Sequence, residues 1–382
     1  MTDEQEFLIS NRPNKSDLKV FLVDIVSKDV SKEILEDRMR ELENLVETYG
    51  WLVVLKKVQR KDHPDYQTYV GKWKLEEIIA DMDRLGANIL IVGNVLKPSQ
   101  IYKINEKLRG IKAEARDRVD LILKIFWKHA TSMESRLQIE LTAIKHMGPR
   151  IFGMWMELSR QWWGIGTSGI GETNIERMKR HLKEKEFKIM KKLEEYERTR
   201  RLHRESRIRK WMPTVWIVWY TNAGKSSLLN SLTKKWGLVE NKLFATLGTH
   251  VWNLYLITNN ETWMGKEILL NDTIWFIRDL PPKLIKSFSS TLEDSIESEL
   301  LLNVIDASDP FVQERINVVN EILDDIGAKQ PRFMVFNKID LIDKSKLAEL
   351  KSRFGWKDVL WISALKWIGL EELKKFLAKK LK

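Results

Sequence analysis

One eight-residue segment of the chain has the residue types and spacing of a phosphate-binding loop. Residues 219–226 read Trp-Tyr-Thr-Asn-Ala-Gly-Lys-Ser and directly follow a short apolar run. The P-loop pattern is G-x-x-x-x-G-K-[ST], so Gly224, Lys225 and Ser226 satisfy it, while Trp219 occupies the position of the first glycine. In such loops the backbone N–H groups and the following helix N-terminus cradle phosphates. The lysine reaches the outer phosphates and the serine hydroxyl holds Mg²⁺, so the segment predicts this chemistry here.

Three further motifs follow in the order expected of a guanine nucleotide site. Asp272 follows an apolar run, where a carboxylate can hold the Mg²⁺ shell. Asp340, in the segment Asn337-Lys338-Ile339-Asp340, can accept two N–H donors from the guanine edge, which disfavours adenine and hence an ATPase. In the segment 363–365, Ser-Ala-Leu, a backbone N–H can meet the guanine carbonyl. Each motif alone could be an ordinary strand end or turn, but their common order makes coincidence improbable.

Composition limits the class of protein. The chain has 382 residues, 43% of them hydrophobic, which suits two or three domains with a substantial core. It has no cysteine and no apolar run long enough for a transmembrane helix, and its polar, acidic start is unlike a signal peptide. We therefore expect a cytoplasmic protein. The net charge of +11 favours an anionic partner.

These motifs need a scaffold, and apolar periodicity predicts one. In the N-terminal part, strands are expected at 18–23, 51–55 and 87–92, with helices at 31–48 and 75–85. This alternation predicts a parallel α/β layer.

The middle of the chain, about 113–210, has a helical and strongly charged pattern. Apolar side chains recur every seven residues at Ile175, Leu182, Ile189 and Tyr196, which predicts a helical hairpin or a short coiled coil. Between Arg177 and Lys210 there are 15 Lys and Arg against 6 Asp and Glu. Most charge runs are solvated helix faces, but this concentration also suits contact with a phosphate backbone. A glycine-rich stretch at 164–171 is expected to form a loop.

From Pro213 onward, strands and helices alternate again. Strands are expected at 214–219, 267–272, 300–306, 332–337 and 359–363, and helices at 225–232, 285–299, 313–326, 345–353 and 369–381. This is the pattern of a doubly wound sheet with the phosphate loop after its first strand. The predicted organisation is an α/β domain at 1–125, a basic helical hairpin with a Gly-rich loop at 126–210 and a P-loop nucleotide-binding domain at 211–382.

Residues 213–382 resemble the G domain of a translation-factor-type GTPase, and segments elsewhere narrow the resemblance to the HflX family. Residues 69–77 resemble its Y-x-G-K-G-K-x-E-E segment. Residues 158–166 resemble its L-S-R-Q-x-G-G-I-G segment, and 171–173 the end of its G-P-G-E-T segment. Residues 276–281 resemble its switch II continuation, so the resemblance runs from about residue 18 to the C-terminus.

The resemblance implies GTP and GDP binding with Mg²⁺, slow intrinsic GTP hydrolysis, and association of a monomer with the large ribosomal subunit and its rRNA. Family members can split or rescue stalled ribosomes. It implies that Lys225 contacts the β- and γ-phosphates, and that Ser226 and Asp272 hold Mg²⁺. Asn222 also matches the pattern of K⁺-stimulated GTPases, although a turn role explains it equally well. The nucleotide-binding residues implied are Trp219, Tyr220, Thr221, Asn222, Ala223, Gly224, Lys225, Ser226, Ser227, Asp272, Trp275, Asn337, Lys338, Asp340, Ser363, Ala364 and Leu365.

The chain departs from the family pattern in one systematic way, because tryptophan occupies several family glycine positions. These are Trp73, Trp162, Trp163, Trp219, Trp275 and Trp367. An indole at Trp219 or Trp275 is expected to crowd the nucleotide, since glycine there leaves room beside the phosphates. A second hypothesis follows: a catalytically silent rRNA-binding scaffold with an impaired G domain. The intact Lys225 and Ser226 argue against it.

Overall fold

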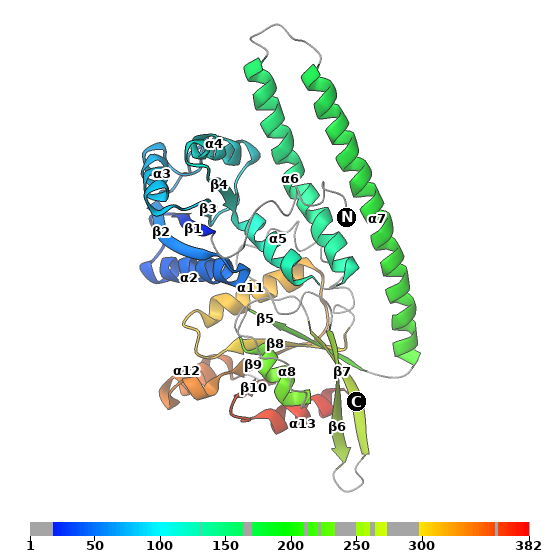
Figure 1. The fold of residues 1–382 in the computed structure, drawn as a ribbon. Helices are drawn as coiled ribbons and strands as arrows, with labels where there is room; N and C mark the ends of the chain where they lie inside the picture. Colours follow the sequence, from blue (N-terminus) through cyan, green and yellow to red (C-terminus); the bar gives the residue numbers. More distant parts are fainter. Residues whose placement is uncertain are drawn as a thin grey trace. The chain divides into compact units, whose positions relative to one another are not determined.

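The computed structural model describes residues 18–130, 132–162, 170–209, 213–220, 223–233, 250–259, 264–272, 298–355 and 358–381. By its internal contacts the chain divides into two compact units (Figure 1). One comprises residues 1–129 and 136–192, and the other comprises 130–135 and 193–382.

The first unit contains a four-stranded, wholly parallel sheet of order β2-β1-β3-β4. Its strands are β1 (Lys19–Val26), β2 (Leu52–Arg60), β3 (Ile89–Val92) and β4 (Glu114–Asp117). The parallel layer and its first three strands are as predicted. Strand β4 corrects the expectation of helix from residue 113 onward. Its four residues are too few to show a period in the sequence, and it forms only by pairing with β3.

The helices of this unit are α2 (Lys32–Tyr49), α3 (Lys72–Leu85), α4 (Pro98–Leu108) and α5 (Arg118–His129). Helix α2 begins where the Ser31 hydroxyl accepts the Ile34 N–H, and it ends at Gly50, whose φ of 99° lies in the left-handed region. Helix α4 was not predicted from periodicity, although Pro98 at its first turn is a start signal.

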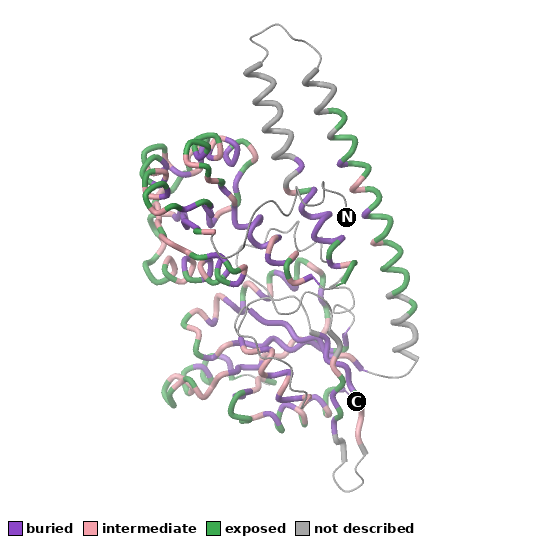
Figure 2. Tube along the Cα trace, viewed as in Figure 1, coloured by how far each residue is buried: buried purple, intermediate pink, exposed green. Residues whose placement is uncertain are grey.

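Two long helices, α6 (Met133–Trp162) and α7 (Ile170–Arg209), form the expected helical hairpin (Figure 1). Lys185 of α7 lies 2.8 Å from the Glu140 carboxylate of α6. Of the predicted heptad positions, Leu182 and Ile189 are buried, whereas Tyr196 is exposed. Most of the other side chains described on α7 are exposed (Figure 2). The hairpin therefore uses a narrow apolar seam and leaves a broad charged face. The predicted glycine-rich loop spans 164–171, and its residues 164–169 lie outside the described part of the chain.

The second unit contains a six-stranded sheet of order β10-β9-β8-β5-β7-β6. All its neighbouring strands are parallel except the pair β6 and β7. The strands are β5 (Thr214–Trp219), β6 (His250–Asn259), β7 (Met264–Asp272), β8 (Leu300–Asp306), β9 (Arg332–Asn337) and β10 (Val359–Trp361). The doubly wound sheet is as predicted, and β6 is an addition at its edge.

Four helices of this unit are described: α8 (Lys225–Thr233), α11 (Val312–Asp325), α12 (Lys344–Phe354) and α13 (Leu370–Lys380). Each lies within about a residue or two of its predicted range. A further helix was predicted at 285–299, and residues 285–297 of that range lie outside the described part of the chain. The central strand β5 is buried, and its apolar residues 215–218 all have 0% exposure. Figure 2 colours the middle of this sheet as buried. No helix among the described residues is long and apolar enough to span a membrane.

Candidate nucleotide-binding site

The predicted site residues gather at one edge of the second sheet. Strands β5, β7, β8 and β9 are parallel, so their carboxyl ends meet at the same edge. The phosphate loop follows β5, Asp272 ends β7, Asp306 ends β8 and Asn337 ends β9. Open α/β sheets bind ligands at this edge. The topology thus brings together motifs that are up to about 120 residues apart.

The phosphate loop itself turns at Gly224. Its φ is 84°, in the left-handed region that glycine tolerates. A Cβ added at this residue would lie 2.5 Å from Nδ2 of Asn337. Helix α8 begins at the next residue, Lys225, and its first free N–H groups therefore adjoin the turn. This is the backbone arrangement that binds phosphate.

Asn337 connects the phosphate loop to the loop after β10. Its Nδ2 donates to the Ala223 carbonyl at 2.9 Å, and its Oδ1 accepts the Ala364 N–H at 3.0 Å. The side chain is only 2% exposed. The Ala364 carbonyl in turn accepts the Ser231 hydroxyl of α8 at 2.8 Å. Four segments of the site are therefore held in one hydrogen-bonded frame.

The residues expected at the guanine base lie beside this frame. The Ser363 hydroxyl donates to Oδ1 of Asp340 at 2.5 Å and also accepts the Lys366 N–H at 3.1 Å. Lys338 has a φ of 63°, and its ammonium lies 2.6 Å from the Asp306 carboxylate. Leu365 is 72% exposed. The Ser363 hydroxyl orients the Asp340 carboxylate and so fixes the direction from which this carboxylate can accept N–H donors of a base.

Trp219 is the unusual member of the loop. It ends β5, paired in register with Val304, and its side chain is 4% exposed. Its backbone φ is not positive, so the conformation at this position is one that a residue with a side chain can adopt. The Lys225 ammonium lies 4.2 Å from the centroid of its indole ring. This cation–π contact engages the Lys225 ammonium, the group that would otherwise contact a phosphate.

The next loop residue, Tyr220, is held by α11. The Arg315 guanidinium lies 4.3 Å from the Tyr220 ring centroid, and its Nε donates to the Asp309 carboxylate at 3.1 Å. Sequence reasoning missed Arg315, Asp306 and Ser231 as parts of the site. Asp306 carried a signal, since it is an acidic residue at the end of a predicted strand. Arg315 and Ser231 carried none, because only the folded chain brings them to the loops.

Some predicted residues cannot be placed in the site. Thr221, Asn222 and Trp275 lie outside the described residues. Asp272 has its backbone at the end of β7, in register with Ile217 and His250. Ser226 is in the first turn of α8 and is partly exposed. These two remain the residues that could hold Mg²⁺.

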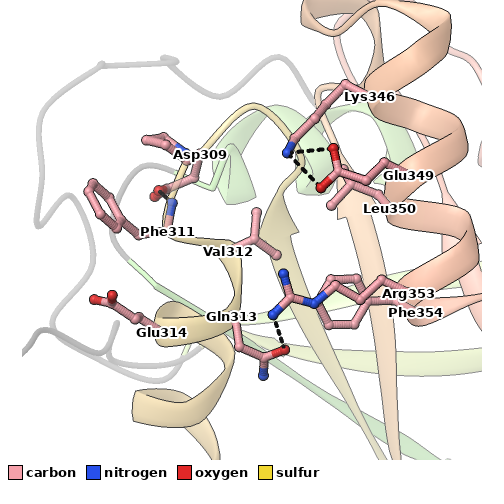
Figure 3. A pocket seen from close by; sticks show the side chains of 11 residues that line it. Asp309, Phe311, Val312, Gln313, Glu314, Lys346, Glu349, Leu350, Arg353 and Phe354 are labelled. Atoms are coloured by element: carbon pink, nitrogen blue, oxygen red, sulfur yellow. Dashed lines mark hydrogen bonds and ion pairs between the residues drawn. The ribbon is translucent and has the colours of Figure 1, made fainter. Parts of the chain in front are cut away.

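A separate pocket of about 110 Å³ lies between α11 and α12 (Figure 3). Lys346 pairs with Glu349 there, and Arg353 donates to Gln313 at 3.2 Å. None of the predicted nucleotide-binding residues lines it. The candidate nucleotide site at the edge of the sheet is therefore separate from this pocket.

A doubly wound sheet with this loop, followed by the Asn337–Asp340 and Ser363–Leu365 motifs at the same edge, defines a P-loop GTPase. Comparison with known proteins agrees. Residues 36–127 match the family described as GTP-binding GTPase N-terminal, 129–207 the GTP-binding GTPase middle region, and 214–338 the 50S ribosome-binding GTPase family.

Individual relatives narrow the class. The chain is 41% identical to GTPase HflX of Caldanaerobacter subterraneus subsp. tengcongensis over 95% of this chain and 80% of that protein. It is 35% identical to GTPase HflX of Escherichia coli, over 91% and 79%. The solved complex of SsGBP with GDP is 29% identical, covers 95% of this chain and 99% of that one, and has a TM-score of 0.50. The chain belongs to the HflX family of GTPases.

Proposed function

We propose that this GTPase associates with the large ribosomal subunit through its rRNA and acts on stalled ribosomes by splitting or rescuing them. The observation that carries this proposal is the face of α7. Lys183, Lys188, Lys191 and Lys192 are all exposed there, whereas among the side chains of α7 that the structure describes only Leu182 and Ile189 are buried. A rigid helix with many cations on its surface suits contact with RNA phosphates.

The proposed chemistry at the sheet edge is the chemistry that the family resemblance implies. Lys225 contacts the β- and γ-phosphates, Ser226 and Asp272 hold Mg²⁺, and Asn222 provides for K⁺. Asp340 accepts two N–H donors of the guanine edge, and Ala364, whose N–H donates to Oδ1 of Asn337 in the described structure, is assigned to the guanine oxygen. The relatives named HflX, and the GDP complex of SsGBP, support this assignment. The whole nucleotide-binding set implied by the sequence stays part of the proposal, as do a cytoplasmic location and a monomeric state.

Sedimentation with large ribosomal subunits tests the proposal. Replacing Lys183, Lys188, Lys191 and Lys192 by Gln should weaken binding and flatten its salt dependence. Each phosphate that the variant no longer neutralises should reduce the slope of log K against log salt by roughly 0.7–0.9. GTP affinity should be unchanged, because these residues are on α7 and not at the sheet edge.

A matched control removes four exposed lysines from the G domain instead. Lys344, Lys351, Lys375 and Lys379 are exposed on α12 and α13. Their Gln variant has the same net charge as the α7 variant. If both variants weaken subunit binding equally, bulk charge and not α7 provides the contact.

A second candidate function is favoured by one observation, the cation–π contact between Lys225 and Trp219. It would make the chain an rRNA-binding scaffold with an impaired G domain. Titration with a fluorescent GTP analogue separates the two. Saturable binding with Mg²⁺-dependent hydrolysis supports the enzyme, whereas ribosome binding without nucleotide binding supports the scaffold.

A further inference from the structure

Two carboxylates and one imidazole converge in the first unit, far from the nucleotide motifs in sequence. Asp117 ends β4, Asp120 lies in the first turn of α5, and His146 lies on α6. One oxygen of each aspartate and a nitrogen of the histidine all lie within 4.8 Å of one another. Asp117 is fully buried, Asp120 is 6% exposed, and the His146 side chain is 18% exposed.

Backbone hydrogen bonds fix both carboxylates in place. Oδ1 of Asp117 accepts the Asp120 N–H at 2.9 Å, and Oδ2 of Asp120 accepts the Asp117 N–H at 3.3 Å. Oδ2 of Asp117 also accepts the Leu96 N–H at 3.1 Å. This reciprocal arrangement at the start of α5 orients one oxygen of each carboxylate toward His146. The donor atoms are thus positioned before any ligand binds.

The position of the imidazole is the independent observation. Nε2 of His146 lies 3.5 Å from Oδ1 of Asp117 and 3.5 Å from Oδ1 of Asp120. The atom is closed off from solvent and makes no hydrogen bond with the part of the chain that is described. Direct N–H···O hydrogen bonds are about 2.7–3.2 Å long, so Nε2 is too far from both oxygens for one.

The same separations fit a metal ion. In a tetrahedral zinc site the bonds to nitrogen and oxygen are about 2.0–2.2 Å, which places neighbouring donor atoms about 3.4 Å apart. A neutral imidazole and two carboxylates carry a charge of −2, which a divalent ion cancels. Of the neighbouring cations, Arg118 is paired with the Glu41 carboxylate, and Lys124 interacts electrostatically with both Asp120 and Glu114.

We propose that Asp117, Asp120 and His146 bind a divalent transition-metal ion of the zinc class. Water completes the coordination on the side where the imidazole is partly exposed. One nitrogen and two oxygen donors suit zinc, whereas calcium and magnesium prefer sets made only of oxygen. The ion joins α6 to the junction of β4 and α5, so its role is structural.

The test uses the full chain freed of metal by a chelator. Zinc chloride should raise its melting temperature and give a saturable calorimetric isotherm with one site, whereas magnesium chloride should give neither at this site. Cobalt(II) should give visible absorption bands typical of a tetrahedral site. His146→Gln should weaken zinc binding by at least about 100-fold, since even loss of a residue that merely orients a ligand costs 10–100-fold.

Two variants keep the result interpretable. His181→Gln removes an exposed histidine from α7 and should bind zinc as the parent does. Asp120→Asn keeps an oxygen for the Asp117 N–H, so it should fold normally and lose zinc. The proposal is overturned if zinc leaves the parent unchanged, or if His181→Gln lowers zinc binding as much as His146→Gln.

Discussion

The amide Nδ2 of Asn337 lies where a Cβ on Gly224 would have to be, at a separation of 2.5 Å. The amide cannot move away easily, because it holds the Ala223 carbonyl and the Ala364 N–H together. The turn of the phosphate loop and the guanine motif therefore constrain each other directly. A substitution at Gly224 or at Asn337 should therefore alter the conformation of both segments.

Gly224→Ala is expected to abolish measurable GTP binding, because the new methyl displaces Asn337 and the backbone φ is positive. The left-handed backbone alone costs an alanine roughly 1–2 kcal/mol. Fluorescent nucleotide titration and thermal denaturation measure the two effects. Gly327→Ala is the matched control, since its φ is also positive at 75° but no described atom lies within 4 Å of the added Cβ. It should lower stability alone, and equal losses of GTP binding in both variants would contradict the argument.

Trp219→Gly, made together with Trp275→Gly, is expected to raise GTP affinity and turnover. The indole no longer holds the Lys225 ammonium, and a cation–π contact is worth roughly 0.5–2 kcal/mol. We expect affinity to rise about tenfold. The variant will be less stable, because Trp219 is buried, so its folded fraction must be confirmed by circular dichroism before titration. Unchanged affinity in folded protein would show that the indole does not compete with phosphate.

Trp367→Gly is expected to stabilise the second unit by about 1 kcal/mol. Trp367 is 60% exposed and has a φ of 59°, a conformation that disfavours a bulky side chain. Chemical denaturation measures the change. Trp73→Gly gives the opposite sign as a control, since Trp73 is exposed in the regular helix α3, where glycine costs up to about 1 kcal/mol. Two changes of the same sign would refute the backbone explanation.

Asp340→Asn is expected to weaken GTP binding and to improve xanthosine triphosphate binding. The amide can no longer accept two N–H donors from guanine, but it can donate to the carbonyl of xanthine. Competition titrations with both nucleotides and ATP measure the shift. Asp343→Asn serves as the control, because Asp343 caps α12 by accepting the Lys346 N–H, which asparagine does equally well. If ATP competes as well as GTP against the parent, the assignment of the base is wrong.

Lys124→Met is expected to stabilise the first unit at pH 7. Burial, with Arg116 nearby, lowers the pKa of Lys124 to about 8 from its ordinary 10.5. The folded state therefore releases this proton before the unfolded state does, and the parent gains stability as pH rises from about 8 to 10.5. The advantage of the Met variant should shrink over the same range. Denaturation at pH 7, 8.5 and 10 measures it, and the exposed Lys32→Met should show no such trend.

The sequence by itself determined the G domain closely. Apart from β6, the described strands and helices from Thr214 onward and the turn at Gly224 follow from local pattern. Periodicity and turn chemistry depend on neighbours a few residues apart, so they can be seen in the sequence. The N-terminal layer and the helical hairpin followed in the same way, although α4 and β4 did not.

Only the tertiary structure decided the contacts between distant segments. It placed Asn337 against Gly224 and Arg315 on Tyr220. It also brought His146 to Asp117 and Asp120, a set with no spacing that identifies a metal site in the sequence. The reason is physical: short strands such as β4 and side-chain pairs across a sheet are stabilised by partners far along the chain. A local pattern cannot report those partners.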